Sequence, residues 1–342
     1  MTAAEPVARP LTVTRDDVAR YAGVSAAVVS YVVNSGPRKV APDTRDRVLN
    51  AIRVLGYRPN TFARALKVGS TKTLGLVVPD ISNPLFAEIA RAVEETAYES
   101  GYALILANSP GGAEVEKQQL QNLGSRRVDG AIVVTPAARP DFSAMINMNV
   151  PIVLINGITE SEAVGSVGVD VFGGARTGVD HLIEHGRTSI GLVMGDNGLR
   201  GTLDRHRGWL QSLQRAGLPE GPIVPVHFSR EGGYSAGQRL LSAASAPTAV
   251  FVSSDLQAVG VLRAFHEAGV RVPEDIALVS FDGSLESQYT WPSLTVVRQP
   301  IPALAQHAVA MLLNRNRQPQ QVLMPGELIV RRSCGCTPTG PD

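Results

Sequence analysis

Beyond residue 72, apolar runs of strand length alternate with amphipathic stretches of helical length along most of the chain. This alternation predicts buried strands separated by helices. The expected strands are residues 73–78, 102–107, 131–134, 152–155, 167–169, 190–194, 224–228, 249–252 and 276–280, and the expected helices are residues 84–100, 114–126, 175–185, 202–216, 232–242 and 256–268. Apolar strands that alternate with helices form parallel sheets covered on both faces, so the expected fold class is α/β.

The strands are too numerous for one comfortable sheet, and we therefore expect two lobes within residues 73–335, followed by a tail at 336–342. Open parallel sheets bind ligands beyond the carboxyl ends of their strands. A cleft between the lobes is accordingly the expected pocket. The long segment 301–313 is expected to pack beneath the lobes or at a dimer interface.

The first part of the chain predicts three short helices in a head at residues 13–58, preceded by a disordered stretch at 1–12. Thr14 stands before a helix with an acidic first turn, and Gly23 ends that helix. Ser25 caps a second helix at residues 26–33. A third helix starts at Asp43 or Thr44 and carries apolar residues at helical spacing on one face.

Charge is distributed unevenly between the two parts of the chain. Residues 1–72 hold twelve Lys and Arg against five Asp and Glu, a net charge of +7. The remainder holds twenty against 26, a net charge of −6. A basic head on an acidic body indicates that the head meets a polyanion, although charge alone does not distinguish DNA, RNA and lipid.

The first two helices meet the constraints of a helix-turn-helix unit. Ala19 is small where two helices must approach closely, and Gly23 lies where the turn needs an unusual backbone angle. In such a unit the first residues of the second helix touch base edges in the major groove, here Ser25, Ala26 and Ala27, with Tyr31 one turn further on. An ordinary helical hairpin is the alternative, and the basic excess argues against it.

Other classes of protein find little support. The chain has no apolar run that could span a bilayer and no secretory signal, which favours the cytoplasm. It contains no Walker loop, G-x-S-x-G elbow or G-x-G-x-x-G motif, so neither catalysis nor a cofactor is expected. Cys334 and Cys336 are interpreted as incidental, and His181 and His185 as a solvent-exposed helix face, so no metal site is expected.

Several short segments of the sequence, taken in order along the chain, resemble those of a known protein family. They are residues 18–25 (VARYAGVS), 29–34 (VSYVVN), 56–60 (GYRPN), 63–67 (ARALK), 74–84 (LGLVVPDISNP), 273–282 (PEDIALVSFD) and 328–334 (LIVRRSC). Together they resemble the lactose-repressor (LacI/GalR) family over residues 14–335. The resemblance implies a helix-turn-helix head and a two-lobed, periplasmic-binding-protein-like sensor domain, joined by a hinge at residues 59–72.

The resemblance also implies a homodimer that binds a near-palindromic DNA operator. The implied DNA-binding residues are Thr14, Ser25, Ala26, Ala27, Ser30, Tyr31, Asn34, Arg58, Asn60, Arg64, Leu66 and Lys67. Leu66 would be an apolar wedge in the minor groove, which kinks the duplex. Tyr31 stands where most relatives have Arg, and Val28 where Thr is common, so the operator is expected to differ from the usual one. Arg9, Arg20, Arg38 and Lys39 can add phosphate contacts.

Polar residues follow the ends of predicted strands in the sensor domain, at Asn156, at Ser254 and Asp255, and at Asp282. The resemblance places Arg205 and Asp282 on ligand hydroxyls or ring nitrogens. By the same resemblance Phe86 stacks on the ligand, and Asn156, Ser254 and Gln299 line the cleft. An Arg and an Asp together favour a neutral, hydroxyl-rich effector such as a sugar, and a nucleobase would also fit. Arg205 and Asp282 could instead form a plain salt bridge on the surface or between the lobes.

The resemblance thus predicts a transcriptional repressor that a small molecule switches. The main alternative is a sugar-binding transport or sensor protein that does not read DNA, and the basic head argues against it. Repression is the norm of the family, although an activator would look similar in sequence. The identity of the effector, and whether it releases or promotes DNA binding, stay open.

Overall fold

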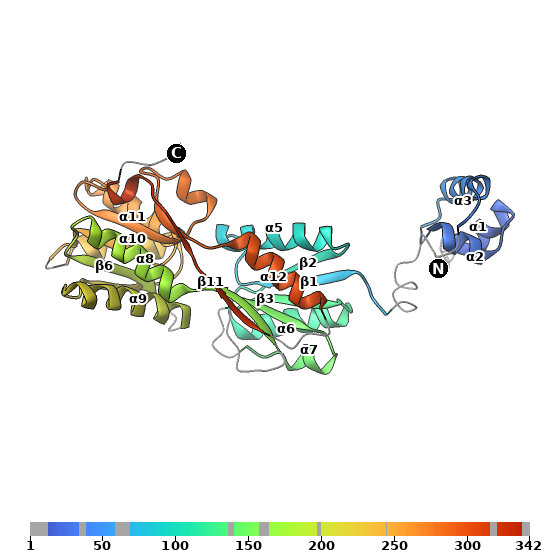
Figure 1. The fold of residues 1–342 in the computed structure, drawn as a ribbon, viewed down its shortest axis with the longest axis horizontal. Helices are drawn as coiled ribbons and strands as arrows, with labels where there is room; N and C mark the ends of the chain where they lie inside the picture. The colour runs from blue at the N-terminus through green and yellow to red at the C-terminus, as the bar shows by residue number, and fades with distance from the viewer. Residues whose placement is uncertain are drawn as a thin grey trace, which may run out of the picture. The chain divides into compact units, whose positions relative to one another are not determined.

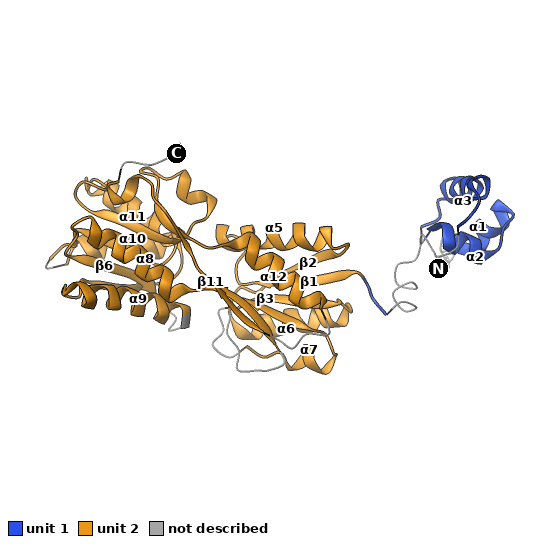
Figure 2. Cartoon of the chain, viewed as in Figure 1, with its two compact units in different colours: residues 1–71 blue, residues 72–342 orange. Residues whose placement is uncertain are grey.

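The structure is a computed structural model that describes residues 13–33, 39–58, 69–135, 140–156, 164–196, 200–243, 245–314 and 320–336. The chain divides into two compact units, residues 1–71 and residues 72–342 (Figure 2). Each unit is described by itself below.

The described residues of the first unit form three helices at the predicted positions, α1 (Arg15–Ala22), α2 (Ala26–Val33) and α3 (Pro42–Leu55). Pro42 opens α3, where its fixed backbone angle suits the first turn and its missing N–H is not needed. The three helices share one small core in which Val18, Val29 and Val48 are completely buried.

The second unit has two lobes, each built on a six-stranded sheet (Figure 1). In the first lobe the strand order is β11-β5-β4-β3-β1-β2 and every pairing is parallel. Its strands are β1 (Thr73–Val78), β2 (Ala103–Asn108), β3 (Gly130–Val134), β4 (Ile152–Ile155), β5 (Gly165–Val169) and β11 (Gln321–Met324). Its helices are α5 (Pro84–Glu99), α6 (Ala113–Ser125), α7 (Ser143–Asn147) and α12 (Ile301–Leu313).

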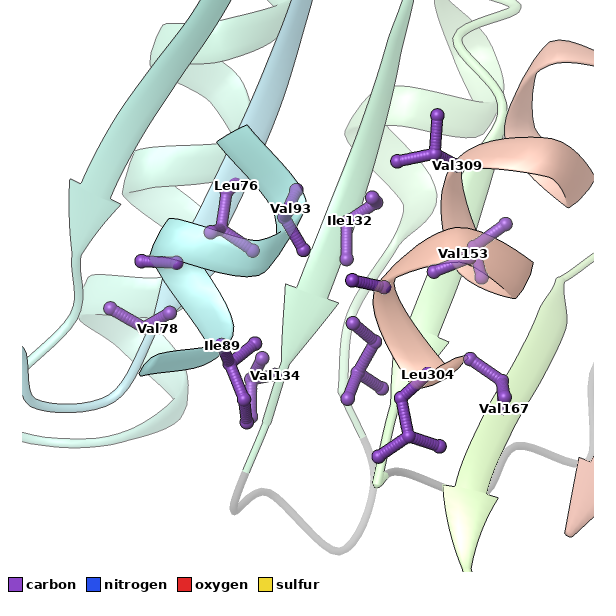
Figure 3. Packing of buried hydrophobic residues seen from close by; sticks show 14 of the residues in the cluster. Leu76, Val78, Ile89, Val93, Ile132, Val134, Val153, Val167, Leu304 and Val309 are labelled. Atoms are coloured by element: carbon purple, nitrogen blue, oxygen red, sulfur yellow. The ribbon is translucent and has the colours of Figure 1, made fainter. Parts of the chain in front are cut away.

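The helices cover both faces of this sheet. On one face, α5 and α12 close over a core of aliphatic side chains (Figure 3). The labelled members are Leu76, Val78, Ile132, Val134, Val153 and Val167 from the strands, Ile89 and Val93 from α5, and Leu304 and Val309 from α12. On the other face, Leu120 and Leu123 of α6 and Met145 of α7 form a second core. Burial on both faces explains why these strands are continuously apolar.

The second lobe repeats the plan with the strand order β12-β10-β9-β8-β6-β7. Its strands are β6 (Ile190–Gly195), β7 (Ile223–Val226), β8 (Ala249–Val252), β9 (Ala277–Asp282), β10 (Thr295–Arg298) and β12 (Glu327–Ile329). Its helices are α8 (Val171–Glu184), α9 (Arg200–Ala216), α10 (Arg230–Leu241), α11 (Asp255–Glu267) and the short 3-10 turns η1 (Leu285–Gln288) and η2 (Arg332–Cys334). The expectation of parallel sheets is wrong for one edge, because β12 runs antiparallel to β10.

Three crossings join the lobes. The chain passes from β5 to α8 at Asp170, returns from β10 to α12 at Gln299, and crosses again between β11 and β12. The Asp170 amide donates to the carbonyl oxygen of Met324 at 2.7 Å, so two of the crossings are hydrogen-bonded to each other. Among the described residues, no helix has the length and apolar character needed to cross a membrane.

Candidate functional site

The start of α1 is fixed by a reciprocal hydrogen-bond pair. The Thr14 hydroxyl accepts from the Asp17 amide at 3.3 Å, and the Thr14 amide donates to the Asp17 carboxylate at 3.0 Å. This capping box satisfies two backbone donors at the helix end. The hydrogen bond from the Thr14 side chain also keeps the pKa of Asp17 below its usual value. Thr14 remains exposed, as a residue that contacts a phosphate would have to be.

The turn between α1 and α2 depends on Gly23. Its φ of 64° is left-handed, and the next amide, that of Val24, donates to the Ala19 carbonyl oxygen at 3.0 Å. The Ser25 hydroxyl accepts from the Val28 amide at 3.4 Å and so caps α2, as the sequence predicted. The helix pair therefore has the tight turn that a helix-turn-helix unit requires.

The first turn of α2 presents small side chains on the surface of the head. Ser25 and Ala27 are exposed, while Ala26, Ser30 and Tyr31 are half-buried. Arg20 and Arg58 are exposed and can reach a polyanion. The predicted DNA-binding residues Asn34, Asn60, Arg64, Leu66 and Lys67, together with Arg9 and Arg38, lie outside the described residues.

In the second unit, four of the predicted effector residues join into one polar chain that connects the lobes. Asn156, at the end of β4, donates through Nδ2 to Oε1 of Gln299 at 2.7 Å. Gln299 lies in the β10–α12 crossing and donates through Nε2 to Oδ1 of Asp282 at 2.8 Å. Nη2 of Arg205 lies 3.6 Å from the same Asp282 oxygen. This polar chain of side chains thus runs from the first lobe, through a crossing, into the second lobe.

Backbone geometry places two members of this polar chain at strand ends. Asn156 and Asp282 both have positive φ angles, 56° and 116°, which L-residues rarely adopt. Oδ1 of Asn156 accepts from the Val169 amide at 3.0 Å, so the side chain also fixes the first crossing. Residues held in such conformations tend to cluster at functional sites.

Arg205 is largely buried, with 12% of its side chain exposed, but it is only partly paired. Its guanidinium stacks over the Phe281 ring at 4.4 Å, and Nη1 donates to the Gly201 carbonyl oxygen at 3.2 Å. Its Nε is buried and has no acceptor among the residues that the structure describes. A buried donor of this kind costs free energy until an acceptor is supplied. Nε of Arg205 can therefore donate a hydrogen bond to an oxygen or nitrogen atom of a ligand.

The electrostatics of this pair follow from burial. Burial raises the pKa of Asp282 to about 8, and the attraction of Arg205 opposes this rise without cancelling it. Burial likewise lowers the pKa of Arg205 from its usual value. Asp282 therefore binds a proton more readily than an exposed carboxyl group does.

Ser254 caps a helix, a structural role that the sequence interpretation did not predict. Its hydroxyl caps α11, accepting from the Gln257 amide and donating to the Gln257 side chain, both at 3.2 Å. The adjacent Asp255 accepts from Ser280 at 2.6 Å and from the amide and hydroxyl of Ser284 at 2.7 and 2.8 Å. Both residues shape the backbone beside Asp282.

The first turns of α5 also reach the second lobe. The carboxylate of Glu88 accepts from the Leu285 amide of η1 at 2.7 Å. Phe86, two residues earlier, is half-buried and packs against the core of the first lobe. Sequence reasoning singled out Phe86 and missed Glu88, because nothing in the local sequence marks an acceptor for an amide 197 residues away.

The interpretation of His181 and His185 as a solvent face is wrong for His181, which is only 8% exposed. The last turn of α8 packs against the C-terminal segment, and Cys336 contacts both histidines. The two residue pairs that appeared incidental in the sequence are therefore neighbours in the fold.

The two units together define a class of protein, in which a helix-turn-helix head is joined to a two-lobed α/β domain. Residues 14–60 match the family described as bacterial regulatory proteins, lacI family, and residues 179–334 match the periplasmic binding protein-like domain. The HTH-type transcriptional repressor PurR of Yersinia pestis is 37% identical over 329 residues, which cover 94% of this chain and 96% of the relative. The chain belongs to the LacI family of bacterial regulatory proteins.

Solved structures agree with this assignment. The Lac repressor dimer bound to operator and the anti-inducer ONPF has a TM-score of 0.83 and 29% identity, covering 94% of this chain and 99% of its own. The transcriptional regulator CelR in complex with cellobiose has a TM-score of 0.70 and 30% identity over 95% of this chain and 100% of its own. A LacI-family regulator from Enterococcus faecium with bound ribose also has a TM-score of 0.70, with 30% identity over 76% of this chain and 98% of its own.

Proposed function

We propose that this chain is a transcriptional repressor that binds a near-palindromic DNA operator as a homodimer and is switched by a small effector between its lobes. The observation that carries the proposal is the largely buried polar chain of Arg205, Asp282, Gln299 and Asn156, which connects the lobes of a protein whose other unit is a helix-turn-helix head. A ligand that engages this chain changes the hydrogen bonds that hold the lobes together. Repression itself is supported by the similarity to the PurR repressor.

In the head, the proposed DNA-reading surface is the start of α2. Exposed Ser25 and Ala27, with Ala26 beside them, suit contacts with thymine methyl groups and phosphates, and Tyr31 can donate to a base or a phosphate. Ser30 on the same helix, and Thr14 and Arg58 elsewhere on the head, are proposed to complete the surface together with Asn34, which lies outside the described residues. The hinge residues Asn60, Arg64, Leu66 and Lys67 are proposed to bind the minor groove.

In the sensor unit, the proposed effector is neutral and rich in hydroxyl groups, and a sugar is the favoured class. Arg205 offers donors and Asp282 offers an acceptor within one buried site, a combination that suits vicinal hydroxyls. Bound ribose and cellobiose in two similar structures support this class. Gln299, Asn156 and Phe86 are proposed as further contacts, whereas Ser254 is assigned to the cap of α11.

The test is selection of bound sequences from random duplex DNA by the purified protein at a stated salt concentration. We expect enrichment of a near-palindrome with a flexible central step, bound at least about 1,000-fold more tightly than random DNA. Leu66→Ala should abolish this enrichment, because the minor-groove wedge is lost. If no site is enriched, the selection is repeated with pooled sugars and nucleobases. Continued failure would mean that the chain senses a ligand without reading DNA.

A further inference from the structure

Two histidines and a cysteine from distant parts of the sequence converge in the second lobe. His181 and His185 lie one turn apart at the end of α8, and Cys336 follows η2. Nε2 of His185 lies 2.8 Å from Sγ of Cys336, and Nε2 of His181 lies 3.5 Å from it. All three donor atoms fall within 4.8 Å of one another, a geometry that no other three His, Cys, Asp or Glu share among the described residues.

The spacing of these atoms suits a zinc ion. Zinc binds imidazole nitrogen at about 2.0 Å and thiolate sulfur at about 2.3 Å, so tetrahedral ligand atoms lie about 3.3–3.6 Å apart. The separation of His181 Nε2 from the sulfur, 3.5 Å, already falls in this range. The shorter separation from His185 requires a shift of less than about 1 Å, which exposed His185 and half-buried Cys336 can make.

Hydrogen bonding prepares His185 to be a ligand. Its Nδ1 donates to the backbone carbonyl oxygen of His181 at 2.8 Å, because a carbonyl oxygen can only accept. Nε2 therefore carries the free lone pair, and this is the atom that faces the sulfur. Metal-bound histidines usually hold their other N–H on a carbonyl or carboxylate in this way. The last turn of a helix also carries partial negative charge, which favours a cation.

Cys334 lies two residues before Cys336 and is 1% exposed. Its Sγ donates to the Arg331 carbonyl oxygen at 3.4 Å and does not belong to the group of three donor atoms. Two histidines and one cysteine form a donor set that zinc accepts with water in the fourth position. The sequence alone did not reveal it, because H-x-x-x-H and C-x-C are each unspecific, and 151 residues separate His185 from Cys336.

We propose that His181, His185 and Cys336 bind a zinc ion that fastens the C-terminal segment to the end of α8. The segment already lies over the core of the second lobe, in which Cys334 is buried. An ion at this position would link the two ends of the lobe's sequence and stabilise the folded state by mass action. This site is separate from the polar chain between the lobes and does not depend on it.

The test uses reduced, tag-free, full-length protein with Zn²⁺ as the probe, in competition with a chromophoric chelator. We expect one tight equivalent per chain and a rise in the melting temperature that a chelator reverses. Co²⁺ in place of Zn²⁺ should give the thiolate charge-transfer absorption of a sulfur-bound ion. Cys336→Ser and His185→Gln should each weaken zinc binding at least about 100-fold.

The matched control is His307→Gln. His307 also lies on a helix and places Nδ1 3.0 Å from the carbonyl oxygen one turn earlier, but it belongs to no ligand cluster among the described residues. This variant should bind zinc as the unaltered protein does. The proposal is overturned if the unaltered protein binds no stoichiometric zinc, if Cys336→Ser binds it equally well, or if the cobalt complex lacks the thiolate absorption. Equal melting temperatures of all variants without metal would show that folding is intact.

Discussion

Asp255 and Asp282 are two buried carboxyl groups of the second lobe with different partners. Asp255 accepts three hydrogen bonds from Ser280 and Ser284. Burial nevertheless raises its pKa to about 6, because these hydrogen bonds only partly compensate for the loss of water. Asp282 has one side-chain hydrogen bond, from Gln299, and a looser ion pair with Arg205. Asp255 therefore fixes the backbone at Ser284, and Asp282 can still accept hydrogen bonds from a ligand.

Asp255→Ala should destabilise the second lobe by about 2–4 kcal/mol, because it leaves the buried donors of Ser280 and Ser284 without an acceptor. Urea unfolding followed by tryptophan fluorescence measures this effect. Buried Trp209 and exposed Trp291 are the chain's two tryptophans and both belong to this lobe. A change below about 0.5 kcal/mol would contradict the structural role of Asp255.

The raised pKa of Asp282 gives effector binding a pH dependence of defined sign. A ligand that donates hydroxyl hydrogens needs Asp282 ionised, and below about pH 8 the free protein holds the proton. Affinity for the effector should therefore rise with pH by up to about tenfold per unit below this value and level off above it. Calorimetric titrations between pH 6 and pH 9 check this. Asp282→Asn should lose the dependence, and a flat profile in the unaltered protein would remove Asp282 from the ligand.

At the scale of elements, α5 and η1 form a direct link between the lobes through Glu88 and the Leu285 amide. The two partners are 197 residues apart in the sequence and belong to different lobes, so this contact adds to the covalent crossings between the lobes. A hydrogen bond to a carboxylate contributes most when both groups are held by rigid elements. Helix α5 is anchored by Ile89 and Val93 in the core of the first lobe (Figure 3).

Glu88→Ala should weaken effector binding by about 3- to 10-fold, because the two lobes lose the hydrogen bond from the Leu285 amide to the Glu88 carboxylate. The matched control is Glu95→Ala on the same helix, since Glu95 pairs with Arg91 one turn away, at 2.8 Å. That variant should bind the effector normally. Equal affinities of the two variants would show that the contact between α5 and η1 does not contribute.

Sequence patterns predicted the elements well where amphipathic helices separate long apolar strands. They missed α7, β10, β11 and β12, because segments of three to five residues carry too little periodicity. Within the site, Arg205, Asp282, Gln299 and Asn156 were singled out and are joined in one polar chain. Glu88 and the cluster of His181, His185 and Cys336 were not predicted, because such contacts join residues far apart in sequence that no local pattern connects.

At the scale of the whole molecule, the division into residues 1–71 and 72–342 separates DNA reading from effector sensing. Each unit has its own hydrophobic core. A unit with its own core is expected to fold alone.

Removal of residues 1–67 should therefore leave a folded protein that binds the effector with unchanged affinity and has lost operator binding. Circular dichroism, calorimetry and fluorescence anisotropy with the selected operator measure the three properties. Retention of operator binding by the shortened chain would contradict the assignment of DNA reading to the head. An unfolded product would contradict the independence of the second unit.

The position of α12 and β11 near the end of the sequence affects the order in which a ribosome can complete the lobes. Strands β1 to β5 are synthesised first, yet Leu304 and Val309 of α12, which cover Val153 and Val167, emerge only after the strands β6 to β10 of the other lobe (Figure 3). During translation one apolar face of the first sheet thus stays partly uncovered, the kind of surface that chaperones recognise. A premature stop near residue 300 would consequently damage the lobe that was made earliest.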